Sequence, residues 1–318
     1  MNDTEYSTES NNTTNDVAVS VFNKQIKSIL KISLVLLLFI MTNYINGLLI
    51  AVFFKHNVFH ENSRYILFIH MVFNDVLDIC TVLILHIWVE TLHMMPVSLC
   101  YFLMSVAITT TYNTPLNLAL MAIERYIAIC RPLHHPKICT LHRTYIILIM
   151  MWLISFISPA SDILFVFTVE PLSFFSTKTI CETDSLLRTE AQTMKRDYMS
   201  IGYFLVAWIV VALTYINIVL AARSASRAEK SPAKKAYNTI LLHAIQLTLS
   251  TFMFLVPVVN NLWLYFQKQE SQDVQYVSYV SIVMFPRLLS PLIYGVREEN
   301  FKKYLKEYLQ CWKFAKNS

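Results

Sequence analysis

The chain has 318 residues, of which 55% are hydrophobic and only 15% are charged, and it contains three glycines. This balance excludes an ordinary soluble domain, whose water-exposed surface needs more charge and whose loops need more glycine. The net charge of +5 comes mainly from the predicted cytoplasmic face, where anionic lipid is the expected partner, so nucleic-acid binding is not predicted.

Seven stretches are long and apolar enough to cross a bilayer. A crossing helix needs about 20 apolar residues, because the hydrocarbon core is about 30 Å thick and a helix rises about 1.5 Å per residue. Few charged side chains lie within these stretches, which indicates an all-α, seven-helix membrane bundle rather than buried helices of a soluble core. The predicted spans are 29–54, 65–88, 97–129, 144–167, 198–222, 238–266 and 274–296. The charged residues within them are Lys31, Asp75, Asp78, Glu124, Arg125, Asp162 and Arg287.

The distribution of lysine and arginine predicts the orientation. With the N-terminus outside, sixteen of the 26 basic residues fall in cytoplasmic segments and seven in exterior ones. The positive-inside rule therefore favours an exterior N-terminus and a cytoplasmic C-terminus. Three regions follow: a glycosylated extracellular tail at 1–27, the membrane domain at 28–296, and a cytoplasmic amphipathic helix and tail at 297–318.

The N-terminal tail carries three glycosylation acceptors. The triplets NDT, NNT and NTT begin at Asn2, Asn11 and Asn12, on the side that the charge rule places outside. A disordered polar tail is the simpler interpretation, and the two are compatible.

Two of the six cysteines fall in the oxidising compartment. Cys100 opens the third span and Cys181 lies in the second exterior loop, so we expect a disulfide between them. Cys130 and Cys139 should remain reduced on the cytoplasmic side, and Cys80 is interpreted as a small core residue. No Cys/His spacing predicts a metal, and no cofactor is expected.

The segment after the seventh span predicts a helix lying in the membrane interface. In "REENFKKYLKEYLQCWKF" the apolar residues recur at steps of three and four, with lysines largely on the other face. Cys311 near its end is either a palmitoylation site or an ordinary free thiol. The apolar positions are Phe301, Tyr304, Leu305, Tyr308, Leu309 and Trp312.

Four motifs resemble those of odorant receptors, which are rhodopsin-like G-protein-coupled receptors. "MAIERYIAICRPLHHP" (121–136) is similar to the signature MAxDRYxAICxPLxY, with Glu124 for aspartate and His135 for tyrosine. "KKAYNTILLH" (234–243) resembles the segment KAFSTCxSH that opens the sixth helix, and "PRLLSPLIYGVR" (286–297) resembles the motif PMLNPxIYSLR. "LTYINI" (213–218) matches the fifth-helix pattern SYxxI loosely. Ser290 in place of asparagine and a single cysteine in the second exterior loop resemble receptors of teleost fish.

The resemblance implies a switch at the cytoplasmic ends of the helices. Burying an ion pair is rarely a net gain in stability, so a switch explains Glu124 and Arg125 better than a structural role. Arg125 anchored to lipid phosphates is the alternative, and His243 is either a second latch or a solvated side chain. The implied residues are Glu124, Arg125, Tyr126, Tyr215, His243, Pro291 and Tyr294.

A carboxylate at mid-membrane is costly and usually marks function. The resemblance places Asp75 opposite Asn46, Thr114 and Ser290, a polar core that holds ordered water, a bound sodium ion or a protonated carboxyl. Asp78 would either meet a cationic ligand or serve helix packing. Pro115, Pro257 and Pro291 permit kinks in their helices.

The family's pocket positions, carried onto this sequence, predict a mostly apolar cavity with a few hydroxyls. Such a lining suits small, weakly polar molecules, although water-borne amines, amino acids, steroids and bile-acid-like anions stay open. The predicted residues are Met104, Ala107, Ile108, Thr111, Tyr112, Met199, Tyr203, Phe254, Leu255, Val258, Val280 and Met284.

The sequence thus predicts an odorant receptor in the plasma membrane of olfactory cilia. Its expected partners are a small-molecule odorant, membrane lipid and a heterotrimeric G protein of the olfactory stimulatory type that raises cyclic AMP. A non-olfactory receptor for a lipid, amine or peptide is the alternative. A transporter would need a continuous polar pathway, and no enzyme is expected because nucleophile–base pairs and phosphate loops are not found.

Overall fold

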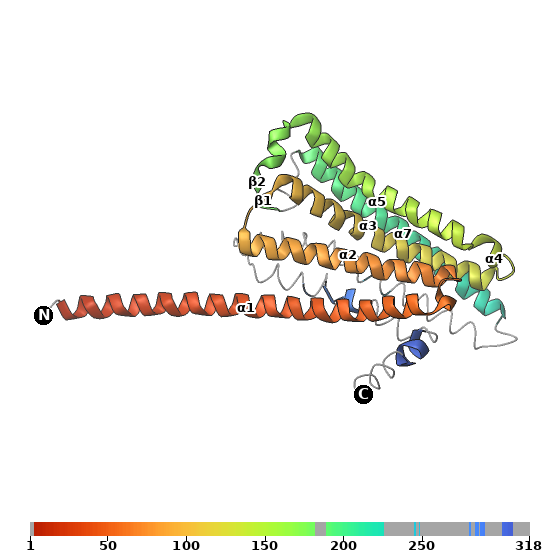
Figure 1. Cartoon of the computed structure of the whole chain (residues 1–318), viewed down its shortest axis with the longest axis horizontal. Helices are drawn as coiled ribbons and strands as arrows, with labels where there is room; N and C mark the ends of the chain where they lie inside the picture. The colour runs from red at the N-terminus through yellow and green to blue at the C-terminus, as the bar shows by residue number, and fades with distance from the viewer. Residues whose placement is uncertain are drawn as a thin grey trace.

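The computed structural model describes residues 3–181, 189–225, 245, 248, 280, 284, 285, 287–289 and 301–307, with only the backbone course for residues 3–25, 27, 28, 90 and 222–225. The predicted sixth and seventh spans therefore lie almost wholly outside the described residues. Figure 1 shows long helices side by side, with β1 and β2 at one end of the bundle and α4 at the other. These ends are named the exterior end and the cytoplasmic end after the orientation that the sequence predicts.

Five long helices contain the first five predicted spans, which confirms the all-α membrane fold for this part of the chain. The shorter elements are the helix α4 (His135–Ile138), the 3-10 turns η1 (Asn57–Phe59) and η2 (Leu172–Ser176), and the strands β1 (Met95–Pro96) and β2 (Lys178–Thr179). The long helices are α1 (Asp3–Lys55), α2 (Ser63–Leu92), α3 (Val97–Cys130), α5 (Leu141–Val169) and α7 (Glu190–Ala225).

Helix α1 begins far before the predicted first span and extends beyond the rest of the bundle (Figure 1). The tail is polar, but the sequence holds no proline before Pro96 and no glycine before Gly47, so nothing breaks the helix at the membrane boundary. The polar tail is thus helical from Asp3 onward, whereas a disordered tail was one of the interpretations that the sequence left open. Its extracellular position and glycosylation stay predictions.

Helix α3 is the central helix of the described part, in contact with α2, α5 and α7. Apolar windows long enough to span a membrane occur in α1, α2, α5 and α7, whereas α3 carries buried polar side chains such as Thr110, Asn113 and Asn117. Neighbouring helices shield α3 from lipid, so it tolerates this polarity. Helix α5, by contrast, exposes Ile149 and Leu153 as a lipid-facing helix does.

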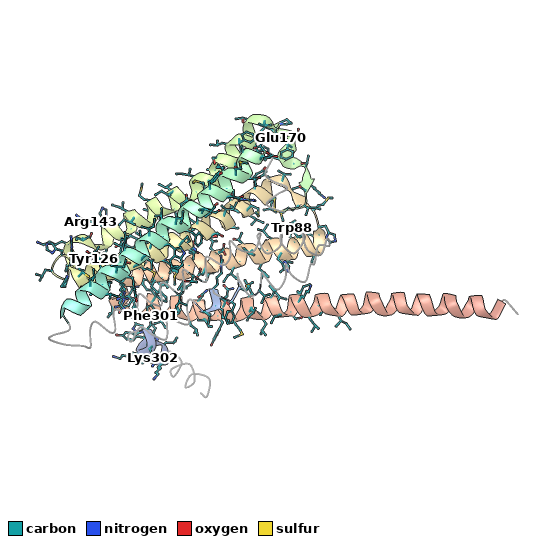
Figure 2. All side chains as sticks on the ribbon, turned by 180° about the vertical axis from the view of Figure 1, so that it is seen from behind. Trp88, Tyr126, Arg143, Glu170, Phe301 and Lys302 are labelled. Atoms are coloured by element: carbon teal, nitrogen blue, oxygen red, sulfur yellow. A yellow bond between two sulfur atoms is a disulfide. The ribbon has the colours of Figure 1, made fainter. Side chains whose placement is uncertain are left out.

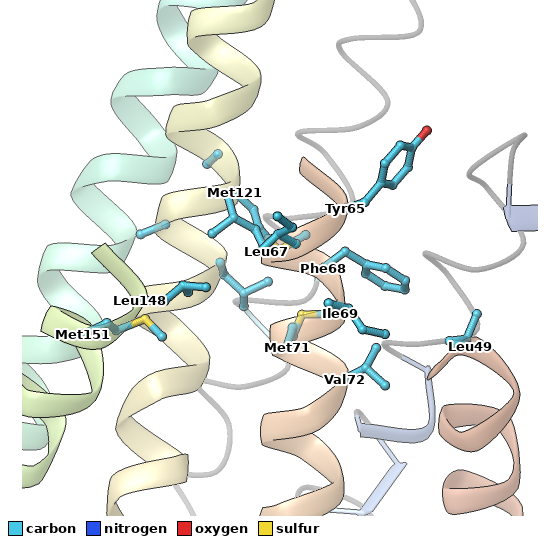
Figure 3. Packing of buried hydrophobic residues seen from close by; sticks show 14 of the residues in the cluster. Leu49, Tyr65, Leu67, Phe68, Ile69, Met71, Val72, Met121, Leu148 and Met151 are labelled. Atoms are coloured by element: carbon cyan, nitrogen blue, oxygen red, sulfur yellow. The ribbon is translucent and has the colours of Figure 1, made fainter. Parts of the chain in front are cut away.

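The largest apolar cluster ties α2 to its neighbours in the cytoplasmic half (Figure 3). The cluster includes Leu67 and Met71 of α2, Met121 of α3 and Leu148 of α5 (Figure 3). In lipid, where the hydrophobic effect between helices is weak, such contacts act through close packing and polar bonds. Asn117 adds one bond, donating to the Leu67 carbonyl at 3.2 Å.

The exterior end is held by a disulfide and a small sheet. Cys100 and Cys181 are bonded with their Cα atoms 5.6 Å apart, as the compartment argument predicted. Beside this bond β1 pairs antiparallel with β2, with Met95 opposite Thr179. Two-residue strands are too short to show a period-two pattern, and sequence reasoning missed them.

Residues 301–307 are helical and pack against the turn between α1 and α2. The Phe301 ring stacks on Phe59 with centroids 4.3 Å apart, and Tyr304 stacks on His56 at 4.1 Å. Figure 2 places Phe301 at the same end of the molecule as Tyr126. The interfacial position of the whole segment stays a prediction, and Cys311 lies outside the described residues.

Candidate functional site

The cytoplasmic end of α3 holds a buried carboxylate with two partners. Glu124 is 5% exposed, and its Oε2 lies 3.8 Å from Nε of Arg125. A shorter contact of 2.9 Å joins its Oε1 to Nε2 of His135. The short helix α4, which follows directly on α3 with Pro136 in its first turn, turns the chain back so that His135 reaches Glu124.

His135 is the partner that sequence reasoning missed. The signal was present, because His135 is one of the two departures from the odorant-receptor signature, the other being Glu124 itself. Both substituted positions meet in the structure. The contact also explains why Glu124 tolerates burial, since an imidazole supplies a polar partner where the helix backbone cannot.

One cysteine lies within electrostatic reach of this carboxylate. Burial, and then the negative charge of Glu124, raises the pKa of the Cys139 thiol, so this cysteine stays protonated and unreactive at neutral pH.

Tyr126 of α3 and Tyr215 of α7 both pack around Ile218, which brings together two predicted switch residues. His243, Pro291 and Tyr294 lie outside the described residues.

The structure describes part of the predicted polar core. Thr114 accepts a hydrogen bond from Nδ2 of Asn74 at 3.2 Å, so the residue of α2 that reaches it is Asn74, next to Asp75. Asn46 is fully buried, and its side chain has no hydrogen bond to another described residue. Ser290 lies outside the described residues.

Of the two α2 aspartates, Asp78 is the one with close contacts to other helices among the described residues. Its Oδ1 accepts from the Thr110 hydroxyl of α3 at 2.5 Å, and its Oδ2 pairs with the guanidinium of Arg287. Asp75 lies within electrostatic reach of the same guanidinium. Of the two interpretations of Asp78, these contacts favour helix packing over a ligand contact.

Two tyrosines of the predicted ligand site lie together between α3 and α7. The rings of Tyr112 and Tyr203 stack with centroids 4.6 Å apart. The Tyr112 hydroxyl is 3.0 Å from Oγ of Ser200, and the Tyr203 hydroxyl donates to the Ile154 carbonyl of α5 at 2.9 Å. These bonds link α3, α5 and α7 through polar groups.

An ion pair lies at the exterior ends of α5 and α7. Nζ of Lys195 donates to Oδ1 of Asp162 at 2.5 Å and to Oγ of Ser161 at 2.8 Å. Gln192 donates to the same Asp162 oxygen at 3.3 Å. Sequence reasoning placed Lys195 in an exterior segment and did not predict this partner, because α7 begins at Glu190 rather than at 198.

The other predicted pocket residues do not gather at one point. Met284 and Val280 pack with Ile79 of α2 and Val35 of α1, and Met104 packs with the cluster beside the disulfide. The remaining third-span positions and Met199 are partly exposed: Ala107, Ile108, Thr111 and Met199. Phe254, Leu255 and Val258 lie outside the described residues.

Comparison with known proteins identifies the scaffold. Residues 45–294 match the family model of the 7 transmembrane receptor (rhodopsin family). The chain belongs to this family. The receptor is 30% identical over 268 residues to Odorant receptor 131-2 of Danio rerio, a match covering 84% of this chain and 82% of the relative.

Human relatives are more distant. Olfactory receptor 6Q1 of Homo sapiens is 29% identical over 215 residues, which is 62% of each chain, and Olfactory receptor 6C6 is 27% identical over 61% of each. The resemblance to odorant receptors, and to those of fish in particular, is confirmed by these relatives. The protein is a multi-pass membrane receptor and not an enzyme.

Proposed function

We propose that this receptor is an odorant receptor that binds a small, weakly polar molecule in the outer half of the bundle. Binding would activate a heterotrimeric G protein of the olfactory stimulatory type and raise cyclic AMP. The observation that carries the proposal is the similarity to a fish odorant receptor along 84% of the chain. The proposal includes an exterior N-terminus, a cytoplasmic C-terminus and a location in olfactory cilia.

The stacked tyrosines offer a route from ligand to switch. Tyr112 lies on α3 and Tyr203 on α7, and the same two helices bring Tyr126 and Tyr215 together at the cytoplasmic end. A ligand that separates the tyrosine rings would favour a bundle with different α3–α7 packing. A ligand shifts such an equilibrium only by its difference in affinity for the two states.

At the cytoplasmic end, Arg125 is the group to be released. Its contact with Glu124 is long, at 3.8 Å, whereas Glu124 has a closer partner in His135. The guanidinium can therefore leave Glu124 without stranding a buried carboxylate, which would otherwise cost several kcal/mol. Freed, Arg125 becomes a contact for the G protein.

The test is a ligand screen in cells. Tagged receptor, the G protein and a cyclic-AMP reporter are expressed together and exposed to fractions of water-borne odorants, with surface receptor counted in the same cells. We expect at least one fraction to raise cyclic AMP, and Arg125→Ala to lower that response more than tenfold at equal surface density. Silence across the panel from a well-expressed receptor would refute the proposal.

A further inference from the structure

Three parts of the chain converge on one buried guanidinium. Arg287, from the predicted seventh span, is 9% exposed and pairs with Asp78 of α2, which is 1% exposed. Thr110 of α3 donates to the other oxygen of the same carboxylate. Asp75, one helical turn away on α2, is 3% exposed and lies within electrostatic reach of Arg287.

Such an arrangement is costly unless every charge has its partner. A guanidinium placed alone at this depth would lose its hydration without compensation. A buried pair contributes little net stability, but removal of either partner strands the other. The pair therefore fixes which faces of α2 and of the segment around Arg287 meet, and Thr110 ties α3 into the same contact.

We propose that Arg287 is the resident cation of the α2 carboxylates, so that the polar core of this receptor holds a side chain where a metal cation would bind. The sequence left ordered water, sodium and a protonated carboxyl open for Asp75. A sodium ion and a guanidinium carry the same charge and would compete for Asp78 and Asp75, since like charges a few ångström apart repel strongly in a medium of low dielectric constant. This inference goes beyond the proposed function and needs neither ligand nor G protein.

The experiment measures thermal unfolding of the purified full-length receptor in detergent, in sodium chloride and in choline chloride at equal ionic strength. We expect the wild-type midpoint to be the same in both salts. Arg287→Gln should lower the midpoint in choline by about 5 °C or more, because it strands Asp78. Sodium should restore part of that loss in the variant, because the vacated carboxylates can then take a metal cation.

Arg131→Gln is the matched control, because Arg131 is exposed at the end of α3; its midpoint should match the wild type in both salts. A sodium-specific rise in the wild-type midpoint would overturn the proposal, since it would show a metal bound beside Arg287. An Arg287→Gln midpoint within about 1 °C of wild type would overturn it as well.

A second set of variants covers a failure of Arg287→Gln to fold. Asp78→Asn and the double variant Asp78→Asn with Arg287→Gln are compared by yield of folded receptor and by midpoint. If the two groups pair, the double variant should be more stable than the sum of the single losses predicts. Losses that simply add, or a double variant that is worse than the sum, would contradict the pairing.

Because the readout is unfolding, its outcome is independent of the ligand screen. A receptor silent to every odorant fraction can still show the sodium-insensitive midpoint, and a responsive receptor can still show sodium binding. The proposed function and the role of Arg287 can therefore be refuted independently of each other.

Discussion

The two ends of α3 are held in different ways. At the exterior end, Cys100 is covalently bonded to Cys181, and the β1–β2 pair lies beside it. At the cytoplasmic end, Glu124 is held by one contact of 2.9 Å to His135 and one of 3.8 Å to Arg125. One end is fixed by a covalent bond, and the other by noncovalent contacts of a buried carboxylate.

This difference suits a receptor that turns binding outside into movement inside. A two-state change needs an element with two arrangements of similar free energy. The exterior sheet and disulfide hold the exterior end of α3 in place. The contacts of Glu124 can change partner at a low cost in free energy, because His135 remains when Arg125 leaves. Variants that weaken each end of α3 in turn, and then its middle, test this contrast.

Loss of the disulfide should have the largest effect. Cys100→Ser opens a loop of sequence separation 81, for which chain entropy alone predicts a loss of about 4 kcal/mol. We expect surface expression to fall severalfold, measured by flow cytometry with an exterior tag. Cys139→Ser, which alters a free cytoplasmic cysteine, is the control and should traffic normally. Normal surface expression of Cys100→Ser would remove the contrast between the two ends.

Loss of the His135 contact should cost less. His135→Ala leaves the buried Glu124 with only the longer Arg125 contact, and loss of a hydrogen bond to a charged group costs about 1.5–3 kcal/mol. The unfolding midpoint should fall by a few degrees. His135→Tyr, which keeps a hydrogen-bond donor, should lose less, and His134→Ala, at an exposed neighbour, should change nothing measurable. A loss as large as that of Cys100→Ser would contradict a weakly held cytoplasmic end.

The sequence predicted the membrane-spanning helices better than the side-chain contacts between them. Apolar length placed the first five spans, and compartment reasoning placed the disulfide. The partner of Asp78 could not be predicted, because whether Arg287 or a ligand faces it depends on how two helices distant in sequence are rotated about their axes. Lys195 and Asp162 were missed for a related reason: the pair exists only because α7 starts early enough to carry Lys195 on its first turns.

The smallest effect is expected between the two ends. Tyr112→Phe removes the hydroxyl bonded to Ser200 but keeps the ring stacked on Tyr203, so stability should fall by about 1 kcal/mol. If ligand binds beside this stack, the agonist concentration for half-maximal cyclic AMP should rise a few-fold. Tyr203→Phe is the matched variant, since it loses a bond to the Ile154 carbonyl and keeps the same ring contact.

The pair of variants separates ligand contact from helix packing. If both hydroxyls only hold helices together, the two substitutions should change stability alike and leave agonist potency unchanged. A change in agonist potency confined to Tyr112→Phe would place the ligand against α3, the helix whose exterior end is held by the disulfide. Unchanged potency in both would instead mean that the ligand enters elsewhere, and that the signal reaches Glu124 without passing through the tyrosine stack.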